Sequence, residues 1–116
     1  MSDDGLDLLR GTLDLLILKA LDTGPLHGYA LSKWVKTASG EMLAVEDRAL
    51  YIALHRLEAR KLIRGGWHVT ETGRRARRYE LTAAGQKRLR ADREYWKRYV
   101  LAMNAVLHTG LAEEPA

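Results

Sequence analysis

The chain has 116 residues, enough for one domain with a modest core, and 47% of them are hydrophobic, which is ordinary for a globular protein. It contains no cysteine, which excludes disulfide bonds and thiolate metal sites and suits a reducing compartment. The net charge is +4, and residues 60–78 alone hold seven basic side chains against one acidic side chain. Such a basic segment either binds a polyanion or forms a solvated charged face.

The first predicted helix covers residues 6–21. Leu9, Leu13 and Leu16 recur at helical spacing, and further leucines widen the apolar face, so we expect this helix to be buried on most sides. Pro25 excludes its continuation. Two charged residues interrupt the apolar run and an acidic segment precedes it, so we expect no signal peptide, no membrane span and a cytoplasmic protein.

A second helix is predicted over residues 27–37. Its apolar positions are Tyr29, Ala30 and Trp34, with Val35 beside them.

The third predicted helix, residues 47–60, has the narrowest apolar stripe. Leu50, Leu54 and Leu57 follow at intervals of four and three residues and define one buried face. The opposite, outward face then carries Arg48, Tyr51, Ile52, His55 and Arg56.

A β-hairpin is predicted over residues 67–81. Trp67 and Val69 alternate with polar residues, and Tyr79 and Leu81 do so after a turn that contains Gly73. This places four arginines at the tip of the hairpin or on its second strand: Arg74, Arg75, Arg77 and Arg78.

The last predicted helix begins near Thr82, a suitable N-cap, and ends near residue 107. Its length of about 26 residues corresponds to roughly 39 Å, more than a domain of this size can cover. It carries an apolar stripe that either joins two chains in a homodimer or folds back onto its own core. That stripe consists of Leu89, Trp96, Tyr99, Val100, Met103, Val106 and Leu107.

Three helices, a hairpin and a long helix indicate a mainly α fold with a small β-hairpin, a winged helix-turn-helix. We expect one compact domain overall, with residues 1–81 as a DNA-binding unit and residues 82–116 as a dimerisation helix and tail. In such folds the third helix enters the major groove of double-stranded DNA, and the wing lies along the flanking backbone. Guanidinium groups suit the wing because they pair with phosphate in a bidentate manner.

Four segments together resemble the PadR family of bacterial transcriptional regulators, in the right order and spacing over residues 8–108. They are LRGTLDLLIL from Leu9, GPLHGYAL from Gly24, LYIALHRLE from Leu50 and RRARRYELTAAG from Arg74. The resemblance implies a dimeric winged-helix protein, in most members a repressor, that binds a palindromic operator and often responds to small aromatic or cationic compounds. It also implies that Tyr51 contacts DNA and that Arg74–Arg78 form the wing.

The chain departs from the family around the third helix. Family members place small residues before the Leu-Tyr pair and proline after it, whereas Glu46 and Asp47 precede the pair here and Ile52 follows it. Two carboxylates at this position repel phosphate unless they cap the helix or pair with Arg48.

Other kinds of site find no support in the sequence. The four histidines lack metal-ligand spacing, no nucleophile context or phosphate loop is present, and we expect neither an enzyme nor a bound cofactor or metal. Tyr95, Trp96 and Tyr99 either line an effector site between subunits or form plain interface core. Two functions therefore stay open: a DNA-binding repressor, and a winged-helix module that binds an acidic protein partner without an operator.

Overall fold

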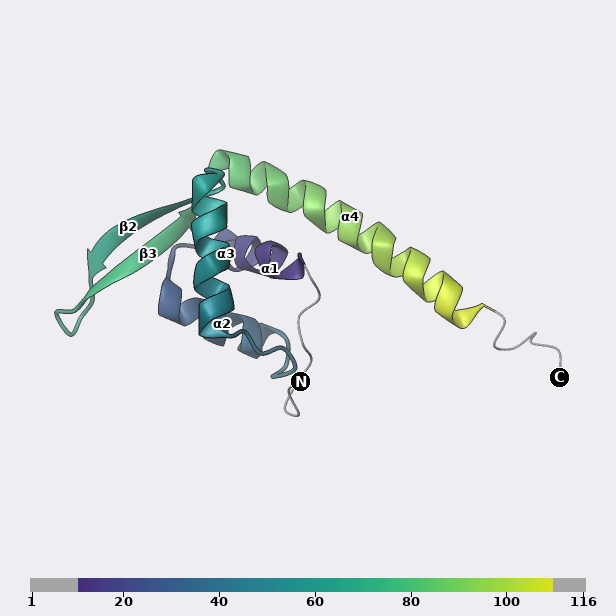
Figure 1. Cartoon of the computed structure of the whole chain (residues 1–116), viewed down its shortest axis with the longest axis horizontal. Coiled ribbons are helices and arrows are strands. Elements are labelled where there is room, and N and C mark those ends of the chain that lie inside the picture. Colours follow the sequence, from purple (N-terminus) through teal and green to yellow (C-terminus); the bar gives the residue numbers. More distant parts are fainter. Residues whose placement is uncertain (1–10, 110–116) are drawn as a thin grey trace.

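The computed structural model describes residues 11–109, and within that range it forms four α-helices and one antiparallel sheet (Figure 1). The mainly α, winged-helix architecture predicted from the sequence is confirmed. The elements in chain order are α1 (Thr12–Asp22), β1 (Leu26–His27), α2 (Gly28–Ala38), α3 (Asp47–Ala59), β2 (Ile63–Val69), β3 (Arg75–Leu81) and α4 (Ala83–His108).

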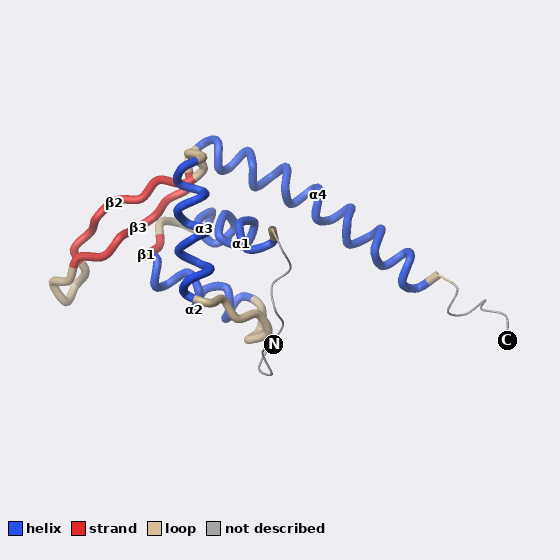
Figure 2. The backbone as a smooth tube through the Cα atoms, viewed as in Figure 1, coloured by secondary structure: helices blue, strands red, loops and turns tan. Residues whose placement is uncertain are grey.

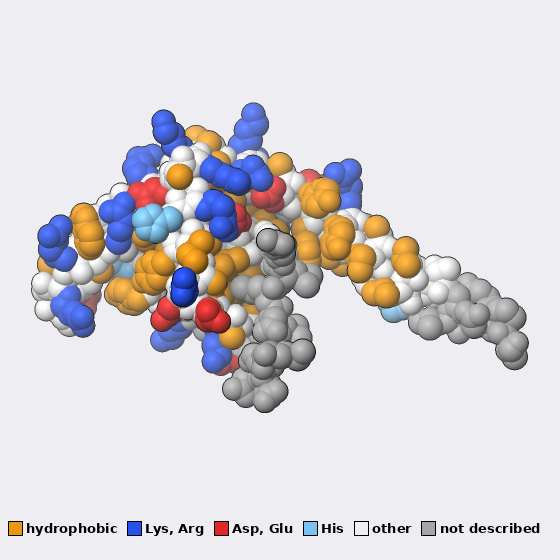
Figure 3. Space-filling view, viewed as in Figure 1, with side chains coloured by type: hydrophobic (Ala, Val, Ile, Leu, Met, Phe, Trp, Pro, Cys, Tyr) orange, Lys and Arg blue, Asp and Glu red, His pale blue; other side chains and the backbone are white. Residues whose placement is uncertain are grey.

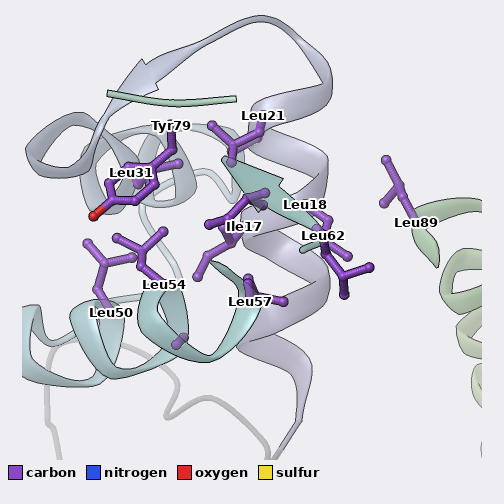
Figure 4. Packing of buried hydrophobic residues seen from close by; sticks show 13 residues of the cluster. Ile17, Leu18, Leu21, Leu31, Leu50, Leu54, Leu57, Leu62, Tyr79 and Leu89 are labelled. Carbon is purple, nitrogen blue, oxygen red and sulfur yellow. The ribbon is translucent and has the colours of Figure 1, made fainter. Parts of the chain in front are cut away.

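The hydrophobic core lies where α1, α2 and α3 meet the base of the hairpin (Figure 4). The stripe of Leu50, Leu54 and Leu57 on α3 is fully buried, as its spacing predicts. From α1 the core receives Ile17 and Leu18, while the expected first turns of that helix, residues 6–10, lie outside the described residues. The amphipathic pattern of three short helices therefore suffices to enclose one core.

The inner face of α2 differs from the prediction at two positions, Tyr29 and Leu31. Tyr29 is 63% exposed, whereas Leu31 and Val35 are buried one turn apart. Trp34 packs against the core from its edge. The prediction for Tyr29 is wrong because the inner face of α2 is set by Gly28, Leu31 and Val35, and the Tyr29 ring stacks on His27 instead.

The sheet has one more strand than predicted. The two-residue strand β1 pairs with the outer side of β3, which places β3 between β1 and β2 (Figure 2). The strand β2 also begins at Ile63, four residues before the alternating pattern, because Gly65 and Gly66 interrupt that pattern without interrupting the pairing with β3. At the other end Gly73, with a φ of 82°, closes the turn.

The long helix α4 starts at a capped and tightly packed corner. The Thr82 hydroxyl oxygen accepts a hydrogen bond from the Gly85 amide at 3.0 Å, as an N-cap does. A glycine is required there, because a Cβ on Gly85 would lie 2.0 Å from the Leu62 carbonyl oxygen.

Leu89 corrects the predicted dimer stripe. It is only 3% exposed and belongs to the core of its own chain, near Leu62 (Figure 4), so it is not available to a second chain. The reason is that the first turns of α4 pack against α1 and the sheet before the helix leaves the domain. The radius of gyration of 17.2 Å, against about 13 Å for a compact chain of this size, reflects the projecting remainder of α4 (Figure 1).

Candidate nucleic-acid interface

The outward face of α3 exposes the side chains that its periodicity predicts. Arg48, Tyr51, Ile52 and His55 are all exposed, on the side of the helix opposite the buried leucines. Among residues 11–109, Arg48 forms no ion pair. Arg48 near the start of the helix is therefore available to a ligand of opposite charge.

Tyr51 is held in place by the start of α2. A Cβ on Gly28 would lie 3.1 Å from one ring carbon of Tyr51 and 3.2 Å from its hydroxyl oxygen. The ring thus packs against the α2 backbone at Gly28, where a side chain would crowd it.

Arg56 differs from the other predicted contact residues. Its guanidinium forms a two-pronged hydrogen-bonded ion pair with the carboxylate of Asp14 on α1. This hydrogen bond raises the pKa of Arg56 above its ordinary value. The side chain stays partly exposed, but its charge is already neutralised by α1, which makes Arg56 a bridge between two helices.

The two carboxylates that precede α3 lie at the N-terminus of that helix. Glu46 occupies the N-cap position without a side-chain cap hydrogen bond, and Asp47 is the first helical residue. Neither of them pairs with Arg48 in the described part of the chain. Both carboxylates are exposed, and their negative charges interact favourably with the positive end of the helix dipole.

The register of the hairpin separates the four arginines. Arg77 lies opposite Trp67 and Arg75 lies opposite Val69, so these four side chains share one face of the strands, which we call the wing face. Arg78 lies opposite Gly66 and beside His27 of β1, on the other face. Arg74 precedes β3 in the turn, where its amide donates a hydrogen bond to the Thr70 hydroxyl.

The wing face is tied to α3 by an ion pair. Nη2 of Arg77 lies 2.5 Å from Oε2 of Glu58, and both side chains are about two-thirds covered. The hydrogen bond to Glu58 raises the pKa of Arg77, and burial raises the pKa of the neighbouring Tyr79. Since α3 and the wing face are joined here, their exposed side chains border one continuous surface.

Basic side chains gather over the hairpin and over the end of α3 next to it (Figure 3). Acidic side chains lie at both ends of α3, since Glu46 and Asp47 stand at its start and Glu58 lies near its other end, paired with Arg77 of the hairpin.

The opposite face of the hairpin carries a cavity of about 720 Å³ that the sequence did not reveal. The His27 ring stacks on that of Tyr29, and the ring centroids of His27 and His68 are 5.3 Å apart. Nε2 of His27 and Nδ1 of His68 are buried without a hydrogen-bond partner in the described residues. No metal-binding group of three or more suitable side chains occurs within residues 11–109. The pairing of β1 with β3 brings the two histidines together, and β1 is too short to be recognised by periodicity.

The projecting part of α4 exposes the rest of the predicted dimer stripe (Figure 3). Trp96, Tyr99, Met103, Val106 and Leu107 are exposed, and Val100 is half-buried.

Near the middle of α4 the three aromatic residues predicted for an effector meet the start of α1 in a cavity of about 420 Å³. Trp96 and Tyr99 have ring centroids 5.8 Å apart, and Asp92 lines the same cavity.

The sequence model of the transcriptional regulator PadR-like family matches residues 17–91, which include α2, α3, the hairpin and the start of α4. This chain belongs to that family. A transcriptional regulator from Clostridium thermocellum has a similar structure, with a TM-score of 0.76 and 30% identity over 90% of this chain and 96% of that one.

Bacillus subtilis PadR, solved in complex with operator DNA, is a similar structure with a TM-score of 0.62 and 25% identity. The match covers 69% of this PadR-like chain and 46% of that one. A 37.1 kDa protein in transposon TN4556 of Streptomyces fradiae is 42% identical over 78 residues, which are 67% of this chain and 21% of that protein. The chain thus spans about a fifth of the length of this relative.

Across residues 11–109 of this PadR-like chain, none of the helices combines the length and the apolar character that crossing a membrane requires.

Proposed function

We propose that this chain is a dimeric PadR-type repressor that binds a palindromic operator in double-stranded DNA. In this proposal α3 enters the major groove, and the wing holds the adjacent backbone. Arg48, Tyr51, Ile52 and His55 contact the DNA from α3. The division into a DNA-binding unit of residues 1–81 and a dimerisation unit of residues 82–116 is part of the same proposal.

The observation that carries the proposal is the Glu58–Arg77 pair, which joins the wing face to α3. It aligns exposed guanidinium groups of the hairpin with the outward face of the helix, so that one duplex contacts both. The relative from Bacillus subtilis was solved with operator DNA, which supports the same kind of ligand here. Arg56 has a lesser role than the sequence predicts, because Asp14 already binds its charge.

Binding of the full chain to duplexes selected from a random pool tests this function. A palindromic product is expected, because a two-fold symmetric dimer contacts two equivalent half-sites. The logarithm of the binding constant should fall with the logarithm of salt concentration with a slope of roughly −5 to −7 for about six to eight neutralised phosphates. If no duplex binds at low salt, the chain is not a DNA-binding regulator, and a module for an acidic protein partner is favoured.

The exposed stripe on α4 supports the dimeric part of the proposal. Its apolar side chains fall on one side of a helix that leaves the domain, and exposed apolar patches of this kind mark protein interfaces. Sedimentation of the full chain measures the oligomeric state directly, and a monomer at micromolar concentration would contradict this part.

The cavity between α1 and α4 supports an effector of small aromatic or cationic type. Trp96 and Tyr99 offer ring faces, and Asp92 adds a carboxylate, although both Oδ atoms of Asp92 lie 3.1 Å from Nε of Arg88. Aromatic faces beside a carboxylate attract organic cations.

The test is the emission of Trp96 in a Trp34→Leu, Trp67→Leu variant titrated with a panel of aromatic cations. Quenching is expected, and Asp92→Asn in the same background should weaken the response to the cations. An unchanged emission across the panel contradicts the effector proposal and has no bearing on the proposal of DNA binding.

A further inference from the structure

Trp67 is a large aromatic side chain that the hairpin leaves 61% exposed, and its neighbour on the same face, Val69, is equally exposed. A tryptophan carries a large apolar ring, and Trp67 and Val69 are adjacent on one face of β2, so together they form an exposed apolar patch that a ligand can cover. The predicted set of DNA contacts contained the wing arginines and omitted Trp67.

The ring of Trp67 lies among guanidinium groups. Cζ of Arg75 is 4.9 Å from the ring centroid and Cζ of Arg77 is 5.7 Å from it. Such cation–π contacts hold the indole and the two cations in a definite arrangement. The wing face therefore consists of a flat apolar ring with two guanidinium groups of β3 close to it.

Trp67 and its two neighbouring arginines lie on the face of the hairpin that contacts α3. Arg77 binds Glu58 on α3, and Tyr79, two residues further along the same face, is buried in the core. Gly65 makes this possible, because a Cβ there would lie 2.9 Å from two nitrogens of Arg77 and 3.0 Å from the ring of Tyr79. The indole thus borders the same surface as the outward face of α3.

The chemistry of the wing face matches that of a nucleic-acid strand. Along a strand, negative phosphates alternate with apolar deoxyribose and with the edges and faces of bases, and the wing face likewise offers cations next to an apolar ring. An acidic protein surface also offers carboxylates to the arginines, but it lacks the regular alternation of charge and apolar sugar along a strand.

We propose that Trp67 is a DNA-contact residue, whose indole packs against a deoxyribose or base edge while Arg75 reaches a flanking phosphate and Arg77, paired with Glu58, holds the ring in place. This inference rests on the proposed DNA-binding function and adds to it a non-ionic contact that carries part of the affinity. Stacking and packing contacts of aromatic side chains with nucleotides do not neutralise phosphate, so they leave the salt dependence unchanged.

The test compares full-length variants by equilibrium binding to one duplex at several salt concentrations. Trp67→Ala should weaken binding by about tenfold with an unchanged salt slope, and Trp67→Phe should retain most of the affinity because it keeps a ring. Val69→Ala is the matched control, since Val69 is as exposed and lies on the same face but has no ring; it should change affinity less than twofold. Arg75→Ala should weaken binding and also reduce the salt slope by about one.

A second measurement avoids any effect of the substitutions on folding. The parent chain labelled with 5-fluorotryptophan gives one ¹⁹F resonance for each of its three tryptophans, and Trp67→Phe identifies the one from Trp67. On addition of duplex this resonance should shift, whereas that of Trp34 at the edge of the core should stay.

These outcomes separate the inference from the function on which it rests. A parent chain that binds no duplex overturns both. A parent that binds, with Trp67→Ala equally tight and the Trp67 resonance unmoved, overturns the inference alone. If Trp67→Ala instead changes the sedimentation of the chain and leaves DNA affinity unchanged, the wing face is a protein contact and the inference is wrong.

Discussion

Nη2 of Arg77 on β3 lies 2.5 Å from Oε2 of Glu58 on α3, so a single ion pair joins the wing to the third helix. This pair has two opposite effects on the proposed function. It orients the wing relative to α3, and it neutralises one of the cations that the wing offers to phosphate.

Glu58→Gln should release the charge of Arg77. We expect tighter binding to all duplexes, by a few fold, and a salt slope steeper by up to one, because one more cation reaches phosphate. The pair is partly exposed, so the free energy of unfolding should fall by less than about 1 kcal/mol. Glu80→Gln is the control, because Glu80 pairs with Arg64 at 3.4 Å on the other face of the hairpin. Equal gains from both substitutions would mean that only net charge matters.

Arg48→Ala and Arg56→Ala should differ although both residues lie on α3. Loss of Arg48 should relax the preference at one base position by about 1–3 kcal/mol, measured as the ratio of affinities for the selected and a substituted duplex. Loss of Arg56 should mainly lower stability, because Asp14 loses its partner. If Arg48→Ala weakens specific and random duplexes equally, then Arg48 contacts phosphate.

Gly85→Ala should be costly although alanine favours helices. A Cβ at this position meets the Leu62 carbonyl oxygen at 2.0 Å, and α4 or the start of the hairpin must move. We expect a loss of about 1–3 kcal/mol in the free energy of unfolding, measured in urea. Gly66→Ala is the control, since no atom lies within 4 Å of that Cβ, and a similar loss there would point to backbone flexibility as the cause.

Met103→Asp should separate the proposed dimer, because it places a carboxylate in the apolar stripe of α4. Ala105→Asp is the matched control, because Ala105 lies in the same turn but about 200° around the helix from Met103, at roughly 100° per residue, and so points away from the stripe. Sedimentation should show a monomer for the first variant and a dimer for the second. A Met103→Asp dimer would place the interface elsewhere.

Tyr79 should make stability depend on alkaline pH. Burial raises its pKa in the folded state, and the nearby Arg77 offsets part of that effect. Its contribution is fully present below the ordinary tyrosine pKa of about 10 and is lost as pH rises through the raised pKa of the folded state. Urea unfolding of Tyr79→Phe should therefore show a shallower decline above about pH 10 than that of the parent. Parallel declines in the two proteins would show that the phenol ionises as easily in the fold as in the unfolded chain.

The candidate site was only partly predictable from sequence. The outward face of α3 follows from the period of its leucines, and the structure exposes Arg48 and Tyr51 there as expected. Arg56 follows the same period, yet its side chain reaches Asp14, a residue of another helix that no local pattern connects with it. The dimer stripe was overextended to Leu89 for the same reason, because periodicity identifies an apolar face without identifying what covers it.

What the sequence by itself determined is the set of features that depend on neighbours along the chain. These are the helical stripe on α3, the turn at Gly73 and the Thr82 cap, each of which is a matter of local spacing and backbone geometry. The tertiary structure alone decided which side chains are free to act. It paired β1 with β3, required Gly85 against Leu62, and joined the face of Arg77 to Glu58 on α3. Those outcomes depend on contacts between distant segments, and such contacts form only when the core brings the segments together.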